Sequence, residues 1–494
     1  EITTRLVGSE MCIRDRYIFY LICFFICPLG AAAVHTEFVP QIRQEKNSLA
    51  FQLVVDDFSN WKTDFFSVSE KENDAYRLIK DEHIPVVEVV KKLQSLEETG
   101  DNCAARALAG MYLQGEKLPY ARLDALKILK KAAGRGDKVS KRIIGQMLLD
   151  FQYTDFSPVN AFSFLKEAKE GGDPEAAVLF TTACILEDLE EGKESAEKIQ
   201  ELKELSEKGS PLAQMYLLLT RKTLLKQAGK DTGKIDEAMI QLALQSPRLT
   251  YIAALNQAGE RQKECVEKLV KANHPLGIIL KAKTYMADGD WSIAAFMLSR
   301  PPVNKMPEAQ HQLGAYLFLS FMNQSDPDLK EHLREKFISS LRSAADQHHR
   351  KAEYKLASFL MLAGPSLIEN YSPQEKMRMV DVLKREALSG DAMAMNNYGY
   401  HCLTGFYSRK NLKEAEKWLL KAVQENYVPA LTNLALLHAG EFNDGTEGDA
   451  PINYKKSIEF LEKAKAMGDA DAQRHIDYLK EISSKHQKTK SENL

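Results

Sequence analysis

A short alanine-centred pattern recurs along this chain of 494 residues at a nearly constant interval. Ala104 is followed by Leu108, Ala109 and Tyr112, at offsets of 4, 5 and 8 residues. Shifts of 36 residues give two related sets: Ser140, Ile144, Gly145 and Leu148, then Ala176, Phe180, Thr181 and Cys184. A period between about 20 and 50 residues is typical of supersecondary units that stack on their neighbours into a solenoid.

The spacing within each unit is helical. Offsets 0, 4, 5 and 8 fall on one face of a helix with about 3.6 residues per turn. A second apolar stripe follows, at 125–132 in one unit and 161–168 in the next. Each unit is therefore predicted to be a hairpin of two helices that cross at Ala or Gly. The pair Gly100-Asp101 is predicted to end one helix with a left-handed glycine and to cap the next helix with a carboxylate.

We call the first position of the pattern the alanine slot. It is filled by Ala104, Ser140, Ala176, Ala213, Leu249, Gly277, Ala309, Ala352, Ala394, Ala430 and Ala472. Three steps, from Ala309, Ala352 and Ala430 to the next slot, are six or seven residues longer than 36. We expect the extra residues between the two helices of a unit, as in the Gly- and Asp-containing run 442–451. Shorter steps and Pro301-Pro302 predict an irregular joint near 246–302.

These residues carry a resemblance to a known family. Ala104-x3-Leu108-Ala109-x2-Tyr112-x2-Gly115, the stripe 125–133 and the unit around Ala394 and Trp418 resemble the Sel-one-like repeat, a relative of the tetratricopeptide repeat. The resemblance covers about 101–479 and is strongest in the first and last units. It implies a right-handed α/α superhelix that holds protein partners, and it implies no reaction.

The predicted fold class is all-α, a right-handed α/α superhelical solenoid of about ten helical hairpins. We expect the following division: a leader and signal peptide at 1–33, an N-terminal cap at 34–100, an N-terminal repeat block at 101–245, irregular repeats at 246–305, a C-terminal repeat block at 306–484 and a disordered tail at 485–494. Within the cap, 86–96 reads as an amphipathic helix, the second helix of a partial first unit.

The N-terminal segment predicts export. An apolar run at 17–29 follows Arg14 and Arg16 and precedes Ala31-Ala32-Ala33, the pattern of a secretory signal with its cleavage site. The run is shorter than the roughly 20 apolar residues of a membrane span, so cleavage is favoured over an uncleaved anchor. The stretch 6–16 resembles translated sequencing-adapter sequence and is excluded from the fold prediction.

Composition and motifs indicate no catalyst. The net charge of −3 and the isoelectric point of about 6.5 do not match a nucleic-acid-binding footprint. The cysteines Cys103, Cys184, Cys265 and Cys402 lie in different units, which favours structural thiols over a disulfide framework. His348-His349 reads as a surface or capping pair rather than a metal site. We therefore expect no cofactor and no metal.

The partner surface is predicted from the positions that face away from the apolar stripe, at offsets 2, 6 and 9. In the first units these include Arg106, Gly110, Arg142, Gln146 and Thr182. In the C-terminal half they are Phe318, Tyr354, Met361, Tyr400, Leu436 and Tyr478, and aromatic residues and Met commonly supply binding hot spots. The alternative is that these side chains pack against neighbouring units, because a helix inside a solenoid has two buried flanks.

The function favoured by these observations is a non-enzymatic scaffold or adaptor that binds other proteins or peptides, with no nucleic acid and no membrane insertion of the mature chain. Its expected location is extracytoplasmic: periplasmic or secreted, or the secretory-pathway lumen in a eukaryote. Two alternatives stay open, an envelope hydrolase of the secreted cysteine-rich Sel-one-like type and an endoplasmic-reticulum quality-control adaptor. The paired cysteines of that secreted branch are missing here.

Overall fold

The computed structural model describes residues 58, 61–115, 118–150, 152–193, 195–362, 371–405, 409–445 and 449–492. Within these ranges the regular structure is helical, apart from one isolated antiparallel bridge between Tyr153 and His349. The leader and signal peptide expected at 1–33 lie outside the described residues. Among the helices described, none combines the length and the apolar character that a membrane span requires.

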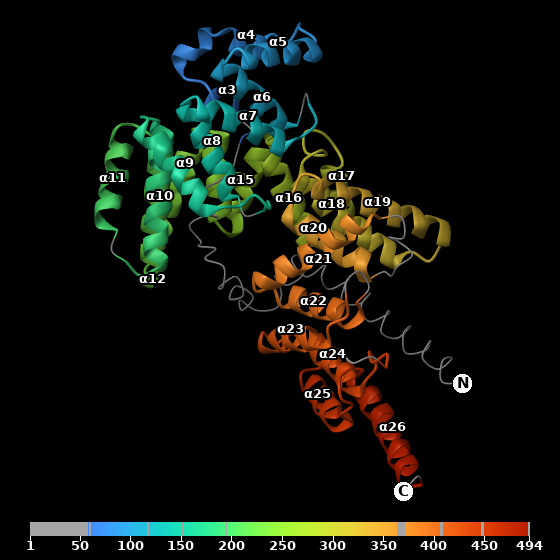
Figure 1. The fold of residues 1–494 in the computed structure, drawn as a ribbon. Helices are drawn as coiled ribbons and strands as arrows, with labels where there is room; N and C mark the ends of the chain where they lie inside the picture. The colour runs from blue at the N-terminus through green and yellow to red at the C-terminus, as the bar shows by residue number, and fades with distance from the viewer. Residues whose placement is uncertain are drawn as a thin grey trace. The chain divides into compact units, whose positions relative to one another are not determined.

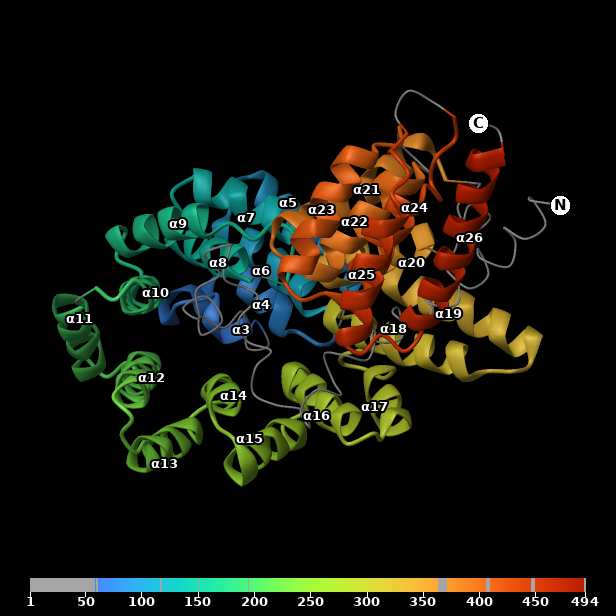
Figure 2. The same ribbon diagram turned by 90° about the horizontal axis from the view of Figure 1, so that it is seen from below.

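Helices that begin a hairpin alternate with helices that complete it (Figures 1 and 2). The first helices are α6 (Asn102–Gln114), α8 (Lys138–Leu149), α10 (Pro174–Glu190), α12 (Pro211–Gln227), α14 (Pro247–Asn256), α16 (Pro275–Ala287), α18 (Pro307–Asn323), α20 (Arg350–Leu362), α22 (Ala392–Thr404), α24 (Val428–Ala439) and α26 (Ala472–Glu492). The second helices are α7 (Arg122–Gly134), α9 (Pro158–Glu170), α11 (Ala196–Glu207), α13 (Gly233–Ala243), α15 (Gly259–Lys271), α17 (Trp291–Leu298), α19 (Pro327–Ala345), α21 (Pro373–Leu388), α23 (Leu412–Gln424) and α25 (Tyr454–Ala466).

Helices that are neighbours in the sequence pack on each other. First helices pack on the second helix before them and on the second helix after them, as α8 does on α7 and α9, and α24 on α23 and α25. The all-α hairpin array predicted from the sequence is confirmed. The chain divides into two compact units within α20, between Glu353 and Tyr354. We call them the N-terminal unit (described residues up to 353) and the C-terminal unit (354–492) and describe each by itself.

Every alanine slot falls in the first turn of a first helix and is buried. The reason is the cap that precedes it. In eight of the eleven first helices the side chain of the residue three positions earlier accepts the slot's backbone N–H, as from Ala104 to Asp101 (3.0 Å) and from Ala176 to Asp173 (2.7 Å). Met306 and Tyr427 supply no side-chain cap, and Ala472 donates to a backbone carbonyl instead. The glycine before each of the caps Asp101 and Asp173 has a positive φ, 96° at Gly100. The predicted glycine stop and carboxylate cap are therefore confirmed in these units.

Other residues take over this role where the Gly-Asp pair is missing. Asn273, His348 and Asn426 are the non-glycine residues with positive φ in the described part of the chain, and each stands where Gly100 stands in its unit. His274 and His349 then act as caps: their Nδ1 atoms accept the N–H of Gly277 (3.4 Å) and Ala352 (3.2 Å). The capping interpretation of His348-His349 is thus confirmed for His349, although the side chain is buried rather than on the surface.

The extra residues of the three longer units are accommodated in two ways, and the sequence prediction missed one of them. The extra residues of two units come between the end of one helix and the beginning of the next, after α24 and after α20, as expected. Of these connections, 363–370 and 446–448 lie outside the described residues. Between Ala309 and Ala352, however, α18 and α19 themselves are longer, with only 324–326 between them. Asp326 caps α19 at once by accepting the N–H of Leu329 at 2.9 Å, so the additional residues extend the helices.

The ends of the array differ from expectation in one place. Before α6 come α3 (Trp61–Asp64), the 3₁₀ helix η3 (Val68–Glu72), α4 (Asp74–Lys80) and α5 (Val86–Glu98), and α5 packs on α6 as a partial first unit would. At the other end α26 continues to Glu492, so the backbone of 485–492 is helical where a disordered tail was predicted. Lys, Gln and Glu are good helix formers, and no Gly or Pro stops the helix there.

Candidate functional site

Side chains at offset 2 join one unit to the next. Arg106 and Arg142 ion-pair with Asp137 (3.4 Å) and Asp173 (3.2 Å), the carboxylates that cap the following first helices. In the C-terminal unit the hydroxyl of Thr432 donates to Asp469 at 3.1 Å in the same way. At these three positions offset 2 therefore points at the neighbouring repeat and not at solvent.

Three of the six residues predicted to face a partner are buried instead. Phe318 is fully buried, with its ring centroid 5.4 Å from that of Phe337, because the long α18–α19 hairpin encloses it. The hydroxyl of Tyr354 accepts a hydrogen bond from the Nδ2 of Asn397 (3.3 Å), and burial raises the pKa of that hydroxyl well above its usual range. Met361 is buried as well. The expectation that these three side chains are open to solvent is wrong, and packing between neighbouring helices accounts for Phe318 and Tyr354.

The other three candidates share offset 6 and form a row on successive first helices of the C-terminal unit. Tyr400 on α22 and Leu436 on α24 are half-buried, and Tyr478 on α26 is 51% exposed. Phe442, from the connection after α24, contacts Tyr400 edge-on, with 6.2 Å between ring centroids. We call Tyr400, Leu436 and Tyr478 the offset-6 row. Their role in binding remains a prediction.

In the N-terminal unit the corresponding position on α6 is covered by an earlier segment of the chain. Gly110 stands at offset 6 of α6, and a Cβ built on it would lie 2.1 Å from Cε3 of Trp61. The indole Nε1 of Trp61 donates to Oε1 of Gln114 at 2.9 Å. Gly110 therefore forms a socket that only a residue without a side chain can supply. Phe65 and Phe66 of the same segment are buried with Trp61.

Three arginines hold this segment in place: Arg106 and Arg142 are buried, and Arg248 is mostly buried. Arg106 donates to the carbonyl oxygen of Phe65 and pairs with the carboxylate of Glu70. Arg142 donates to the carbonyl oxygen of Asp64 at 2.7 Å, and Arg248 lies 3.9 Å from the Asp64 carboxylate. We call the surface that receives the segment the inner face. It consists of Arg106, Gly110, Arg142, Glu175 and Arg248, which come from α6, α8, α10 and α14.

The surroundings of Arg106 determine the protonation states of Glu70 and Cys103. Burial alone would raise the pKa of Glu70, but hydrogen bonds from Arg106 and from the Ser67 backbone lower it to about 2. The carboxylate is therefore charged at neutral pH. Beside it, burial raises the pKa of the Cys103 thiol to about 12, so this thiol stays protonated. The prediction of structural thiols agrees with Cys103, Cys265 and Cys402, which are buried free thiols.

A second polar cluster surrounds Glu308. Its carboxylate is 2.8 Å from Nε2 of His349 and 2.5 Å from Nζ of Lys283, and the ring of His311 stacks on that of His349 with 4.8 Å between centroids. The two histidines and the carboxylate are close enough to share a metal ion. The geometry favours a structural network, because Nδ1 of His349 already accepts the Ala352 N–H, which leaves the proton on Nε2 to be donated to Glu308.

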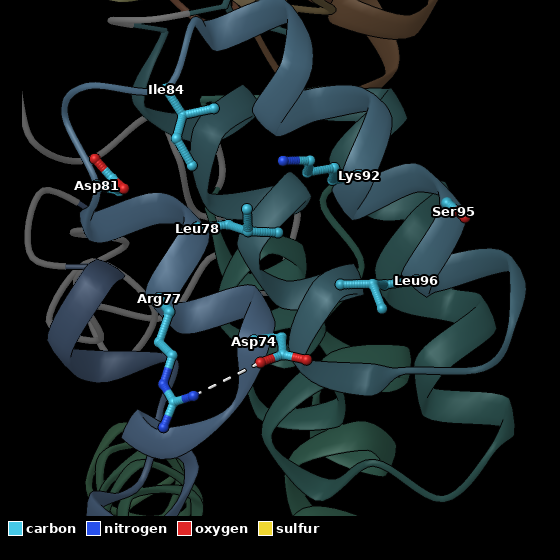
Figure 3. A pocket seen from close by; sticks show the side chains of 8 residues that line it. All are labelled: Asp74, Arg77, Leu78, Asp81, Ile84, Lys92, Ser95 and Leu96. Carbon is cyan, nitrogen blue, oxygen red and sulfur yellow. Dashed lines mark ion pairs between the residues drawn. The ribbon is translucent and has the colours of Figure 1, made fainter.

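One surface hollow, of about 450 Å³, lies between α4 and α5 (Figure 3). Leu78, Ile84 and Leu96 form its apolar part, and Arg77, which pairs with Asp74, lies at its edge. Most of its lining is exposed, and its side chains do not converge on a point where a ligand would bind.

Comparison with known proteins identifies the repeat. The family model described as Sel1 repeat matches residues 104–137, 392–427 and 428–469, which correspond to the pairs α6–α7, α22–α23 and α24–α25. The chain therefore carries Sel1 repeats, as the resemblance predicted. Sel1 repeats commonly mediate protein–protein interactions. A search of curated proteins gives no match.

Two solved structures are similar to the chain. One is c5321, a protective antigen of uropathogenic Escherichia coli strains that displays an SLR fold, with 17% identity and a TM-score of 0.34, covering 80% of this chain and 90% of that one. The other is a Sel1 repeat protein from Oxalobacter formigenes, with 16% identity and a TM-score of 0.24, covering 81% of this chain and 95% of that one.

Proposed function

We propose that this Sel1-repeat chain is a non-enzymatic scaffold or adaptor that is exported from the cytoplasm and binds a protein partner along its first helices. The observation that supports this function most directly is the segment Trp61–Glu72 on the inner face. There a row of first helices holds a peptide segment through a socket at offset 6 and through arginine contacts to backbone carbonyls. The repeat surface of this chain is thus able to hold a peptide.

The partner site in this proposal is the offset-6 row of the C-terminal unit. Tyr400, Leu436 and Tyr478 stand at the offset where Gly110 receives Trp61 in the N-terminal unit, and they become more exposed towards α26. Tyrosine and leucine side chains at a half-exposed helix face suit an apolar or aromatic partner segment. A partner that inserts along these helices would bury all three.

Site-specific photocrosslinking tests the location of this site. A photoreactive phenylalanine is placed at Tyr478 or at Leu436 in the full chain, and the matched control carries it at Leu420, an exposed position on a second helix of the same unit. We expect crosslinks to a common polypeptide in extracts of the source cells from the first two positions and not from Leu420. Equal crosslinking at all three positions would contradict a site on the first helices.

Two further measurements test the rest of the proposal. The purified chain is assayed against a broad panel of envelope hydrolase substrates, and we expect no turnover above that of a heat-denatured sample. Mass spectrometry of the mature N-terminus tests export: we expect the protein to begin near Val34. Detection of 19–27 in the purified protein would contradict cleavage of the signal segment.

A further inference from the structure

Each arginine of the inner face has an ion-pair partner within the repeats, apart from its contacts with the segment that covers the face. Arg106 keeps Asp137 at 3.4 Å, Arg142 keeps Asp173 at 3.2 Å, and Arg248 keeps Glu175 at 2.5 Å. All of these partners belong to the repeats. Removal of a buried charge's last partner is strongly destabilising, but here no arginine loses its last partner when the segment leaves.

The segment itself has little structure of its own. It consists of one turn of α-helix at α3 and of the five-residue η3, lengths at which isolated helices do not persist in water. Its contacts are of the kind a bound peptide makes. Two backbone carbonyls, of Asp64 and Phe65, accept from arginines, Trp61 fills the Gly110 socket, and Glu70 supplies a carboxylate to Arg106.

We propose that the inner face is a preformed peptide-binding site, that Trp61–Glu72 occupies it as a releasable ligand in the same chain, and that it accepts other peptides with the same pattern. The pattern is an aromatic residue, a second aromatic residue four positions later and a Glu five positions after that, as in Trp61, Phe65 and Glu70. This site is separate from the offset-6 row of the C-terminal unit and does not depend on the function proposed for that row.

The chemistry of the face sets this specificity. The socket at Gly110 takes a flat aromatic ring, because a side chain there would collide with the ring of Trp61. The arginines at offset 2 donate hydrogen bonds to backbone carbonyl groups, which every peptide has. The ion pair between the guanidinium of Arg106 and the carboxylate of Glu70 favours peptides with an acidic residue at that position. In the C-terminal unit, offset 2 on α22 and α24 is occupied by Asn396 and Thr432, so a site of this chemistry is not repeated on those helices.

Competition by the segment's own sequence tests the proposal. A fluorescent peptide of residues 61–72 is titrated into the full wild-type chain and into the full chain with Trp61→Ala and Phe65→Ala, and binding is followed by fluorescence anisotropy. We expect at least tenfold tighter apparent binding to the opened variant, because its face is no longer occupied. Adding Gly110→Leu to the opened variant fills the socket and should abolish the gain.

Two controls define the outcome. A scrambled peptide and a peptide with Glu70→Gln should both bind more weakly than the parent. Two results would overturn the proposal, provided that the opened variant keeps its helical circular dichroism. One is that it binds the parent peptide no better than the wild-type chain does. The other is that it binds the parent peptide no better than it binds the scrambled peptide. The segment would then be a permanent part of the core.

If the opened variant does not fold, a cleavable chain gives the answer. A protease site is inserted between Glu82 and His83, in the exposed connection from α4 to α5. After cleavage, the fragment that contains Trp61–Glu72 and α4 is held only by noncovalent contacts, so we expect an added labelled peptide of residues 61–82, which includes α4, to replace it within hours. Retention of the fragment without exchange over several days would overturn the proposal. Neither result depends on crosslinking at Tyr478, so this inference and the proposed function fail or succeed separately.

Discussion

Arg142 ion-pairs with Asp173, the residue that caps the next first helix, and both side chains are about 95% buried. One oxygen of the Asp173 carboxylate accepts the N–H of Ala176 while the carboxylate faces the guanidinium. The same arrangement joins Arg106 to Asp137. A single carboxylate thus begins one helix and fastens it to the helix of the preceding unit.

Substitution of Asp173 should separate these two roles. Asp173→Asn keeps an oxygen that can cap α10 but removes the charge, whereas Asp173→Ala removes both. We expect stability to fall in the order wild type, Asn, Ala, with the last step costing about 1 kcal/mol for the lost cap. Urea unfolding followed by circular dichroism measures it. Equal stability of the wild type and Asp173→Asn would show that the ion pair adds nothing.

Gly399 marks a close crossing of α22 and α23. A Cβ built there would lie 2.9 Å from Cγ of Leu419, so Gly399→Leu should overpack the crossing and cost about 1–3 kcal/mol. Gly399→Ala serves as the graded control and should cost less, because the nearest atom belongs to a side chain that can shift. Thermal melts of the two variants give the comparison, and unchanged melting of Gly399→Leu would contradict the hairpin assignment.

His348 stands in a backbone conformation that favours glycine, with φ at 59°. His348→Gly should stabilise the N-terminal unit by about 0.5–1 kcal/mol, since the strain of a left-handed side chain disappears. The contact of His348 with Glu353 at 3.4 Å is lost, but the histidine side chain is 41% exposed and such pairs contribute little. A matched His332→Gly change, inside α19, should instead destabilise by about 0.3–0.5 kcal/mol, the difference between the helix propensities of His and Gly. If His348→Gly lowers the unfolding midpoint as His332→Gly does, the strain argument is wrong.

The repeat fold could be predicted because its determinants are local. The alanine slot and its cap lie three residues apart, as in Asp101 and Ala104, so period, helix start and buried face are all contained in short stretches of sequence. The same spacing identifies His349 as a cap, because it stands three residues before the alanine slot Ala352, although it is neither Asp nor Ser.

The direction of the offset-2 side chains could not be predicted in the same way. Whether Arg106 faces solvent or Asp137 depends on how two successive units are rotated, and no local pattern specifies that rotation. The docking of Trp61 is also non-local. One signal was present, because Gly110 is a helical glycine outside the apolar stripe at offsets 0, 4, 5 and 8, and the structure explains it by the tryptophan ring.

The last prediction concerns pH. His401 in α22 is buried, and burial lowers its pKa to about 4, so the folded C-terminal unit holds it neutral. In the unfolded chain its pKa is about 6.5, so the unfolded state binds more protons between these two values. This residue's contribution to stability is therefore fully present above about pH 6.5 and is lost as the pH falls towards 4. The loss amounts to roughly 3 kcal/mol at the lower limit.

His401→Gln removes this titration and leaves the other acid-sensitive groups, among them Glu416 and His438, in place. We measure urea unfolding of the wild type and of His401→Gln at pH 7.0 and at pH 4.5. The difference in unfolding free energy between the two proteins should shift in favour of the variant at pH 4.5, because only the wild type gains a proton at this position on unfolding. Groups common to both proteins cancel in that comparison. An unchanged difference at the two pH values would mean that folding does not lower the pKa of His401.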